Sequence, residues 1–544
     1  MRSLSKLLAL NLALLGVLAS TALPGRAQQT SAAAMPGGRV VLVLPFDNRS
    51  GDATLNWIGD SFPDTLDKRL NSAGFLTISH DDRAYALDHL GLPAGFRPSR
   101  ATTIRIAQQL DANYVIVGSY TVKKGTGTSN DHIAIQAQVL SVDALTLSRP
   151  LEDGAELNRL FDAENAIAWK VAREMDPMLN VAEQTFLAAP GAEPLPAFED
   201  YIRGTTAPTA EERIQRLQSA VQLAPDYAAA LLALGKEQYT AHDYAGAATT
   251  LARVPTTDRL ALEANFYRGL AMFNSANYAA AQKAFNFVES KLPLPEVVND
   301  EGVAMSRQGK DGVVLFRRAS VADPSDEDYH YNLAIALFRE GVTDQALSEV
   351  EAALKLTPAD NEAAELRKAL QAASAGSKLA PNSTGGFSPV ERVQRTWSET
   401  SFRQAAFQLD QLRAARMATL PPAQRAVQYS QLGRDYLAEG LLPEAESQFQ
   451  SALAADSGSA EAHAGLAQVR EYSGDSEQAR SEAAVSLQLH PSVEAWMVLA
   501  RLDLAANKLP ASADDVAHAL LIEPGNFAAQ AMRQAIQQRG QIVP

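Results

Sequence analysis

The sequence contains no cysteine, and this absence excludes several kinds of chemistry at once. Without a thiol there is no disulfide framework, no cysteine nucleophile, no zinc–thiolate site and no lipid attached through an N-terminal cysteine. Aromatic residues make up only 7% of the chain, whereas the apolar fraction of 46% and the charged fraction of 20% indicate a folded protein. The formal net charge of −15 argues against broad nucleic-acid binding, which depends on neutralising phosphates, although it leaves room for a local basic groove.

Long apolar runs are also missing, except at the N-terminus. Arg2 and Lys6 precede an apolar stretch at residues 7–20, and residues 25–27 offer small side chains for cleavage. We therefore expect an export signal at residues 1–27; the alternative is an uncleaved N-terminal anchor. No other run approaches the ~20 apolar residues of a membrane helix, so we expect a soluble mature protein. Export without cysteine fits the bacterial periplasm or cell envelope, including peripheral association with the envelope.

Residues 424–456, QRAVQYSQLGRDYLAEGLLPEAESQFQSALAAD, carry the strongest pattern in the chain. Apolar and small residues recur at helical spacing on both sides of a turn at Gly440; they are Tyr429, Leu432, Gly433 and Tyr436, then Ala445, Phe449 and Ala452. This unit resembles the tetratricopeptide repeat, a helical hairpin of ~34 residues. The resemblance implies that small residues lie where two helix backbones approach and that aromatic residues fill the gaps. Such a hairpin cannot bury both of its faces alone, so it needs neighbours of its own kind.

Further copies of this hairpin fill most of the chain. We identify them at residues 226–254, 264–288, 328–358, 461–491 and 493–524, with a looser copy at 295–323. A stretch rich in Gly, Pro and Ser interrupts the pattern near residues 374–389 and predicts a hinge. We therefore expect a first array at 197–374, a linker at 375–389 and a second array at 390–540.

The region before the arrays has a different pattern. Apolar strand-like runs at 39–46, 75–79, 113–122, 132–142 and 145–151 alternate with helical stretches, including 55–74 and a closing helix at 157–187. LPFDNRSGD (44–52), WIGDSFPDTLDKRL (57–70) and IAQQLDANYVIVGSY (106–120) resemble the TolB amino-terminal-domain-like module. This resemblance implies a small domain at 39–187 used for assembly or contact, without catalytic residues. The predicted fold is an α+β N-terminal domain followed by an all-α solenoid in two arrays.

We find no constellation that predicts catalysis. The eight histidines show no metal-ligand spacing, and neither a GxSxG elbow nor a Walker loop occurs. Gly125 and Gly127 could belong to a phosphate loop, but a hairpin turn between two strands is favoured. Asp47 and Asp52 could bind a cation, although hydrogen bonds to their own turn are favoured. We expect a protein that is not an enzyme and that has neither cofactor nor metal.

Binding is the better candidate. In a repeat of this type the first helix of each hairpin lines a groove, and aromatic and Arg side chains make good anchors for a peptide or partner helix. The candidate partner-binding residues of the first array are Lys236, Tyr239, Phe266, Phe273, Tyr331, Phe338 and Arg339. The alternative is that these rings pack between hairpins as core. In the second array the row of Tyr239, Phe273 and Phe338 is replaced by Leu437, Glu471 and Leu504, which predicts a groove of different chemistry.

These features favour a non-catalytic exported scaffold that binds protein or peptide partners in the bacterial cell envelope through its grooves. The alternative is a structural subunit of an envelope or secretion assembly, docked through the α/β domain. No nucleic-acid partner is expected, and the sequence does not identify the protein partner.

Overall fold

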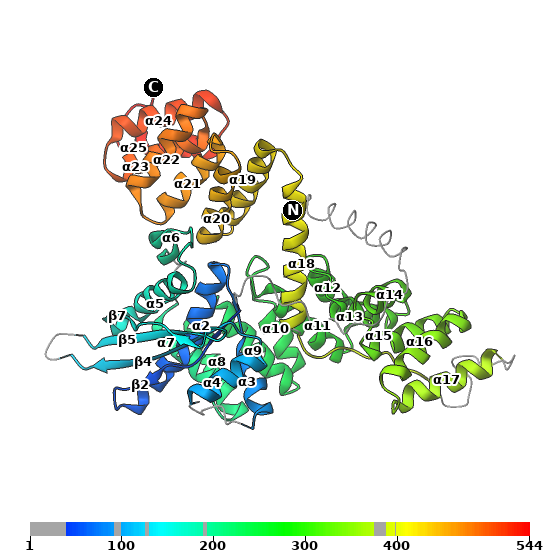
Figure 1. The fold of residues 1–544 in the computed structure, drawn as a ribbon. Helices are drawn as coiled ribbons and strands as arrows, with labels where there is room; N and C mark the ends of the chain where they lie inside the picture. Colours follow the sequence, from blue (N-terminus) through cyan, green and yellow to red (C-terminus); the bar gives the residue numbers. More distant parts are fainter. Residues whose placement is uncertain (1–39, 92–98, 126–129, 189–192, 375–387, 398) are drawn as a thin grey trace. The chain divides into compact units, whose positions relative to one another are not determined.

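The structure, a computed structural model, describes residues 40–91, 99–125, 130–188, 193–374, 388–397 and 399–544 (Figure 1). These residues fall into two compact units. The first unit contains Ala207–Phe407, and the second unit combines Gly38–Thr206 with Gln408–Pro544. The expected export signal and most of the expected linker lie outside the described residues. Within the described ranges, every helix is too short or too polar to cross a membrane.

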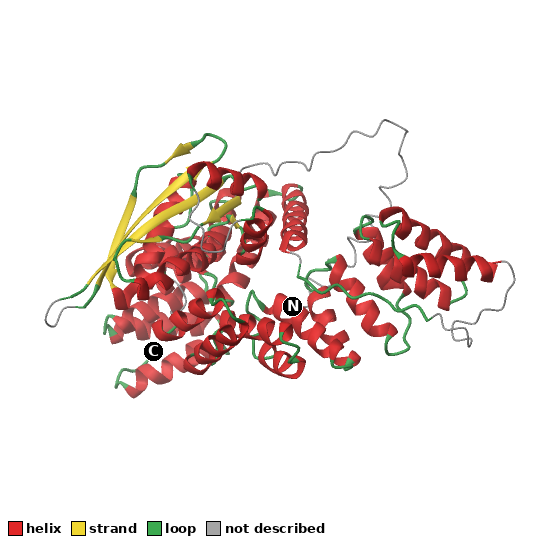
Figure 2. Cartoon of the chain, turned by 90° about the horizontal axis from the view of Figure 1, so that it is seen from below, coloured by secondary structure: helices red, strands yellow, loops and turns green. Residues whose placement is uncertain are grey.

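A mixed sheet forms one layer of the second unit (Figure 2). Its strands are β1 (Val40–Val43), β2 (Asp47–Asn48), β3 (Leu76–Thr77), β4 (Tyr114–Lys123), β5 (His132–Ser141), β6 (Thr146–Leu147) and β7 (Leu151–Glu156). The order is β3-β1-β4-β5-β6, with β2 also beside β4 and β7 also beside β5. β1 runs parallel to β3 and β4, whereas β4 and β5 form a long antiparallel pair. Ile133 and Ile135 of β5 are buried while their neighbours point outward, which is the alternation expected when one face packs on a core.

Helices accompany this sheet in the same domain. They are α2 (Asn56–Ser72), α3 (His80–His89), α4 (Arg100–Gln109), α5 (Leu160–Met175), α6 (Glu183–Leu187) and α7 (Leu195–Thr206), with short 3₁₀ turns at η2 (Ala53–Leu55) and η3 (Leu157–Arg159). The apolar stripe predicted for α2 is buried, since Phe62, Leu66 and Leu70 are fully covered. The Phe62 ring stacks on Phe46, which follows β1, with ring centroids 4.0 Å apart.

One carboxyl group lies buried between α2 and α5. Glu164 of α5 has no exposed surface and accepts hydrogen bonds from the hydroxyls of Ser61, at 2.5 Å, and Thr65, at 2.8 Å. Burial raises the pKa of Glu164 to about 7, because it disfavours the charged form more than these two hydrogen bonds favour it.

Two elements of this domain differ from the sequence prediction. The single strand expected at 145–151 is divided into β6 and β7, with Pro150, which lacks an N–H for the ladder, between them. The helix expected at 157–187 ends at Met175, because Asp176 precedes Pro177 and adopts φ −131° and ψ 89°.

The chain that follows this helix end contacts the second array, within the second unit. Its Ala182 donates its N–H to Glu446, at 3.0 Å, and the hydroxyl of Thr185 accepts from Arg470, at 2.8 Å. Glu446 is itself fully buried and also accepts from Arg470, at 2.6 Å. A buried ion pair therefore fixes this contact.

The first unit consists of helical hairpins. Its helices are α8 (Ala210–Leu223), α9 (Ala228–Thr240), α10 (Tyr244–Leu251), α11 (Ala261–Asn274), α12 (Tyr278–Glu289), α13 (Pro295–Ser306), α14 (Val313–Ala322), α15 (Glu327–Arg339), α16 (Thr343–Leu356) and α17 (Asn361–Ser374). From α9 onward they pair in sequence, and α17 packs against α16 and α15.

The second array repeats the same hairpin. α18 (Glu399–Ala418) precedes it, and its helices are α19 (Pro422–Ala438), α20 (Leu442–Ala455), α21 (Ala460–Tyr472), α22 (Ser476–Leu489), α23 (Val493–Ala505), α24 (Leu509–Ile522) and α25 (Phe527–Gln538). The predicted fold class, an α+β domain followed by a helical solenoid, is confirmed.

Glycine allows the helices of a hairpin to approach each other, as the repeat pattern predicts. The fully buried ring of Phe449 lies between Gly433 and Gly465. A Cβ atom at Gly433 would lie 2.7 Å from the Cε1 atom of Phe449, and one at Gly465 would lie 2.2 Å from it. Gly269 and Phe285 make the equivalent contact in the first array.

Two segments pack against parts of the chain from which the predicted domain boundaries separate them. α7, expected at the start of the first array, packs on the α/β domain: Phe198 meets Trp57 edge to face, and the Tyr201 hydroxyl donates to Asp64, at 2.9 Å. Residues 390–397, expected at the start of the second array, lie against helices of the first unit.

Candidate functional site

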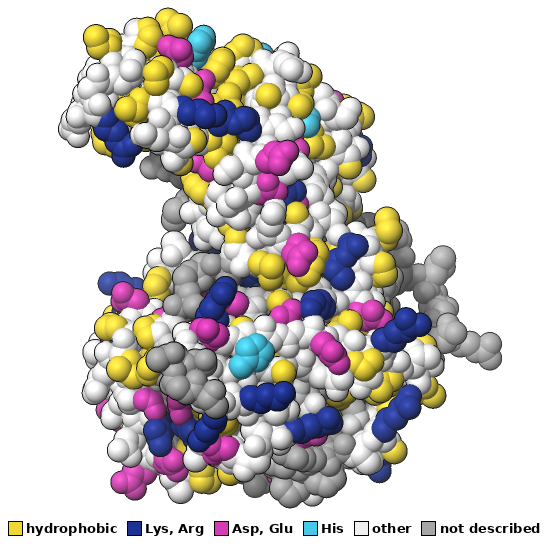
Figure 3. Space-filling view, turned by 90° about the vertical axis from the view of Figure 1, so that its left-hand side faces the viewer, with side chains coloured by type: hydrophobic (Ala, Val, Ile, Leu, Met, Phe, Trp, Pro, Cys, Tyr) yellow, Lys and Arg dark blue, Asp and Glu magenta, His cyan; other side chains and the backbone are white. Residues whose placement is uncertain are grey.

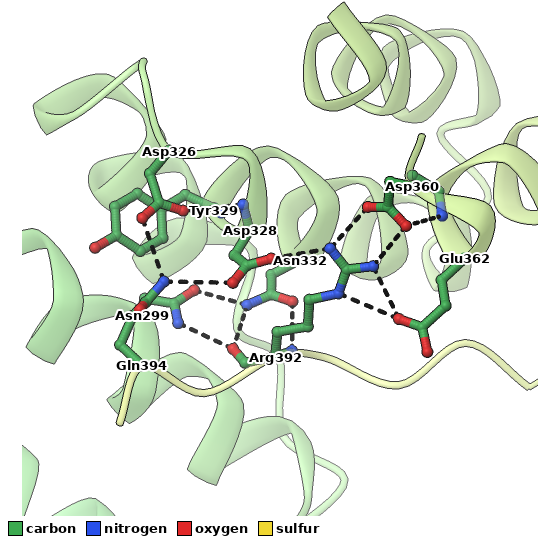
Figure 4. A network of polar contacts seen from close by, with 10 residues as sticks. Asn299, Asp326, Asp328, Tyr329, Asn332, Asp360, Glu362, Arg392 and Gln394 are labelled. Carbon is green, nitrogen blue, oxygen red and sulfur yellow. Dashed lines mark hydrogen bonds and ion pairs between the residues drawn. The ribbon is translucent and has the colours of Figure 1, made fainter. Parts of the chain in front are cut away.

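An extended segment of the chain crosses the first array. Residues 388–397, SPVERVQRTW, form neither helix nor strand. Their contacts come from α13, α15 and the start of α17 (Figure 4), and from Phe266 of α11. α11, α13 and α15 are the first helices of successive hairpins, the ones that the repeat pattern assigns to the groove. We call the surface that these four helices present to the segment the first-array groove.

Two buried asparagines hold the main chain of this segment. The side-chain amide of Asn332 donates to the carbonyl oxygen of Arg392 and accepts from its N–H, both at 2.7 Å. Asn299 donates to the same carbonyl, at 3.1 Å, and accepts from Asn332, at 2.8 Å. Neither asparagine has exposed surface. Because the segment contributes only backbone atoms to these bonds, the two asparagines recognise an extended chain independently of its side chains.

A buried carboxylate extends this main-chain contact by two residues. Asp300 accepts from the N–H of Gln394, at 2.8 Å, and from the side chain of Asn299, at 3.1 Å. Burial raises the pKa of Asp300 well above its usual value, more than these hydrogen bonds lower it. The Gln394 side chain also reaches Asp326, at 3.2 Å, which further fixes the segment on the C-terminal side of Arg392.

The side chain of Arg392 enters an acidic subsite. Its guanidinium contacts Asp328 at 2.9 Å, Asp360 at 2.8 Å and Glu362 at 2.8 Å, and lies 3.9 Å from the centre of the Tyr331 ring. Burial alone would lower the pKa of Arg392, but the hydrogen bonds that its guanidinium donates to the carboxylates raise it above its ordinary value. A planar guanidinium suits such a fork of carboxylates stacked on an aromatic face.

The preceding residue enters a basic subsite. The carboxylate of Glu391, which is 3% exposed, accepts from Arg307 at 2.9 Å, and also from Arg339 and Ser306. Burial alone would raise its pKa, but the hydrogen bonds from Ser306 and Arg339 lower it below the usual value. Arg339 also donates to the carbonyl of Pro389, at 3.2 Å.

Apolar contacts accompany these charges. The side chain of Val393 packs against the core cluster of α13 to α17, next to Phe273. Trp397 lies against Phe266, with ring centroids 5.6 Å apart, and meets Phe402 of α18 at 5.8 Å.

The structure brings four of the seven candidate residues to the segment. Tyr331 lies under Arg392, Arg339 binds Glu391, Phe266 meets Trp397, and Phe273 lines the hollow beside Val393. Phe266 and Tyr331 are nevertheless almost completely buried, so each ring serves the core and presents one face to the groove.

The other three candidates have other neighbours. Phe338 belongs to the apolar core, with 7% of its surface exposed. Lys236 pairs with Glu263, at 2.9 Å, and Tyr239 packs on the rings of Tyr244 and Tyr267, close enough to Arg395 of the segment to interact with its charge. The expected row of Tyr239, Phe273 and Phe338 is therefore not one exposed aromatic surface.

Sequence reasoning missed the polar residues that make the main-chain contacts. Asp300 and Asn332 lie two positions before Gly302 and Ala334, the small residues of their hairpins, and so occupy equivalent places in α13 and α15. Polar residues at equivalent buried positions of successive first helices were the available signal. In the second array Gly465 and Val498 offer no such side-chain bonds at these positions, whereas Gln431, at the third, is exposed and bonds within its own helix.

The remaining chemical candidates have structural roles. Asp52 accepts from the N–H and hydroxyl of Thr54, at 3.0 and 2.6 Å, which is the favoured turn interpretation. Gly125 follows β4, which pairs with β5 as a hairpin; Gly127 lies outside the described residues. In the described ranges, no group of three His, Asp or Glu side chains has a geometry that could hold a metal.

The surface charge of the chain is mixed on the face shown in Figure 3, where Lys and Arg side chains are interspersed with Asp and Glu. The expectation that nucleic acid is not a partner stays a prediction.

The sequence matches no protein-family model and no curated protein. Among solved structures, it is similar to MamA, at 18% identity over 28% of this chain and 92% of that one, with a TM-score of 0.27. It is also similar to YrrB, described as a TPR protein with an unusual peptide-binding site, at 14% identity over 37% and 98%, with a TM-score of 0.28. The C-terminal domain of LpoB from Salmonella enterica matches at 22% identity over 23% and 87%, with a TM-score of 0.18.

Proposed function

We propose that this protein is a non-catalytic scaffold that binds an extended segment of a protein partner in the first-array groove. The observation that carries this proposal is the pair of hydrogen bonds between the Asn332 side chain and the main chain of Arg392. A buried amide that satisfies both the N–H and the carbonyl of one residue holds extended chain, because neither group can then bond within a helix.

The contacts around the segment support binding instead of chemistry. Asn299, Asn332 and Asp300 are committed to backbone atoms, while Arg307 and Asp360 are held in ion pairs with the segment. An arrangement of this kind orders a peptide and covers its polar groups, which is what a recognition surface requires.

A peptide-binding measurement tests this function. In a replacement variant of the full chain, residues 388–397 are exchanged for a Gly/Ser stretch of equal length, and a labelled peptide SPVERVQRTW is added in trans. We expect saturable binding by fluorescence anisotropy, which is lost when Asn332→Leu is also introduced. Binding that survives Asn332→Leu would place the peptide elsewhere and contradict the proposal.

We further propose that the scaffold acts outside the bacterial cytoplasm, in the periplasm or associated with the cell envelope. The basic start, the apolar stretch at 7–20 and the absence of cysteine support this location. Fractionation of cells that express the chain with and without residues 1–27 tests it: the full chain should leave the cytoplasm and the truncated chain should stay there.

A second candidate function is that of a structural subunit docked through the α/β domain. Exposed apolar residues of this domain favour this, since Leu145 is 54% exposed, Leu147 41% and Met178 86%. Light scattering on the purified chain separates the two functions: a large stable homo-oligomer that dissociates on Leu147→Asp supports the structural role, and a monomer supports the scaffold.

A further inference from the structure

The first-array groove has two rims of opposite charge. Asp328 stands in the first turn of α15, and Asp360 and Glu362 stand at the start of α17. Arg307, the C-cap of α13, and Arg339, the last residue of α15, stand at the other ends of these helices. The acidic rim thus lies at helix N-termini and the basic rim at helix C-termini, where each charge is favoured by the helix dipole.

An extended segment that crosses these helices places alternate side chains on the two rims. Successive side chains of an extended chain point to opposite sides, so neighbouring residues meet opposite rims. Glu391 does meet Arg307 and Arg339, and Arg392 does meet Asp328 and Asp360.

The main-chain contacts fix the register of this pairing. Asn332 holds the N–H and carbonyl of the residue whose side chain enters the acidic subsite, and Asp300 holds the N–H two residues later. The residue between them, Val393, packs on the apolar core. A ligand in this register needs an acidic residue, then Arg, then an aliphatic residue; the reverse order would place Arg against Arg339 and a carboxylate against Asp360.

We infer that the first-array groove selects extended protein segments with the sequence acidic–Arg–aliphatic, and that residues 388–397 are the chain's own copy of this ligand. This inference rests on the proposed function and adds its specificity and its regulation. A partner that carries the motif competes with a segment that is already tethered beside the groove. Its apparent affinity is therefore its intrinsic affinity multiplied by the fraction of molecules whose groove is empty.

The test compares two peptides on two full-length proteins by fluorescence anisotropy. The peptides are SPVERVQRTW and the charge-exchanged SPVREVQRTW; the proteins are the wild type and the replacement variant. We expect SPVERVQRTW to bind the replacement variant at least about tenfold more tightly than the wild type. We expect SPVREVQRTW to bind the replacement variant at least about tenfold more weakly than SPVERVQRTW does.

Each failure has a distinct meaning. Equal binding of SPVERVQRTW to both proteins would overturn the competition by the chain's own segment. Equal binding of both peptides would overturn the charge pattern, while the proposed function stands. No binding of SPVERVQRTW to the folded replacement variant would overturn the proposed function itself.

Two controls complete the experiment. Arg501→Ala removes a guanidinium bound to Glu471 in the second array, at 2.5 Å, and should bind the peptides like the wild type. If the replacement variant does not fold, the double variant Glu391→Ala with Arg392→Ala takes its place in the same measurement, because it changes only two residues of the segment. A wild-type dimer that dissociates on Arg392→Ala would overturn the inference of occupancy within one chain, because the segment would then be exchanged between copies.

Discussion

Asn332 of α15 and Arg392 of the extended segment, 60 residues apart along the chain, are joined by two hydrogen bonds of 2.7 Å between one side-chain amide and one residue's main chain. The same amide also donates to Asn299 of the preceding hairpin. The segment is therefore tied to two repeats at once. Contacts of this kind convert a stack of hairpins into a surface with a defined occupant.

Replacing Asn332 with Leu should weaken the first unit and its groove. The buried N–H of Arg392 and the side-chain oxygen of Asn299 lose their partner, which costs about 2–3 kcal/mol when the groups stay buried. Urea-dependent hydrogen exchange of the first unit measures this loss. Gln431→Leu, at the equivalent position of the second array, is the matched control and should change stability by less than about 0.5 kcal/mol. Equal effects of the two substitutions would show that Asn332 has no special role.

Replacing Arg392 with Ala should release the segment. Asp328, Asp360 and Glu362 then face one another without a cation. Their carboxylates repel one another, and water enters the subsite. We expect amide exchange of residues 389–395, followed by mass spectrometry, to accelerate at least about tenfold. Arg392→Lys should have an intermediate effect, because it keeps the charge but loses the planar fork. Unchanged exchange in both variants would mean that the main-chain bonds alone hold the segment.

Glu164 should make the stability of the second unit depend on pH. Its folded pKa of about 7 lies above the ordinary value of 4.5. Between pH 4.5 and about pH 7, Glu164 is therefore protonated in the folded state and ionised in the unfolded state. The stabilising contribution is complete below about pH 4.5 and is lost as the pH rises through about 7.

Glu164→Gln removes this dependence, because the amide stays neutral while it keeps an acceptor for Ser61. Relative to the wild type, the variant should gain stability from pH 5 to pH 8, on the order of 3 kcal/mol. Chemical denaturation across this range measures the gain. Glu174→Gln, on the exposed face of the same helix α5, is the control for the loss of one carboxylate from this helix. A Glu164→Gln profile parallel to that of the wild type would refute the assignment.

Substituting Ala for Gly465 or Gly433 should destabilise the second array. Ala favours a helix by about 1 kcal/mol, but the new Cβ would press on the buried Phe449 ring, and overpacking typically costs about 1–3 kcal/mol. Because the approach at Gly465 is 2.2 Å and that at Gly433 is 2.7 Å, Gly465→Ala should lower the melting temperature more. Gly458→Ala, whose Cβ would meet only the Asp456 carboxylate at 3.4 Å, is the control. Unaltered melting in all variants would mean that the ring moves freely.

The hairpins could be predicted from the sequence because their pattern is local. Gly433 and Phe449 fall within one repeat, and the apolar periodicity of each helix indicates its buried face. The helix of residues 157–187 was overestimated because its apolar spacing continues past Pro177, although that proline ends α5. Local pattern therefore located elements well and their ends less well.

The groove could be predicted only in part, because its contacts are long-range and polar. The search for aromatic and Arg anchors found Tyr331 and Arg339, which do touch the segment. It passed over Asn332 and Asp300, since buried polar residues look like interruptions of an apolar face until their partners are known. The segment itself has no periodic pattern, and its bond to Asn299 spans 93 residues.

The second unit is discontinuous in sequence, and this affects the order in which its parts can meet. Thr185 and its partner Arg470 flank the whole of the first unit. When the chain is delivered from its N-terminus at ~5–20 residues per second, residues 207–407 occupy roughly 10–40 s before the second array follows. At the end of that interval the first unit has its full set of hairpins, whereas the residues around Thr185 still lack their partners Glu446 and Arg470. The hairpins that are synthesised last thus complete the second unit, whose other part lies before residue 207.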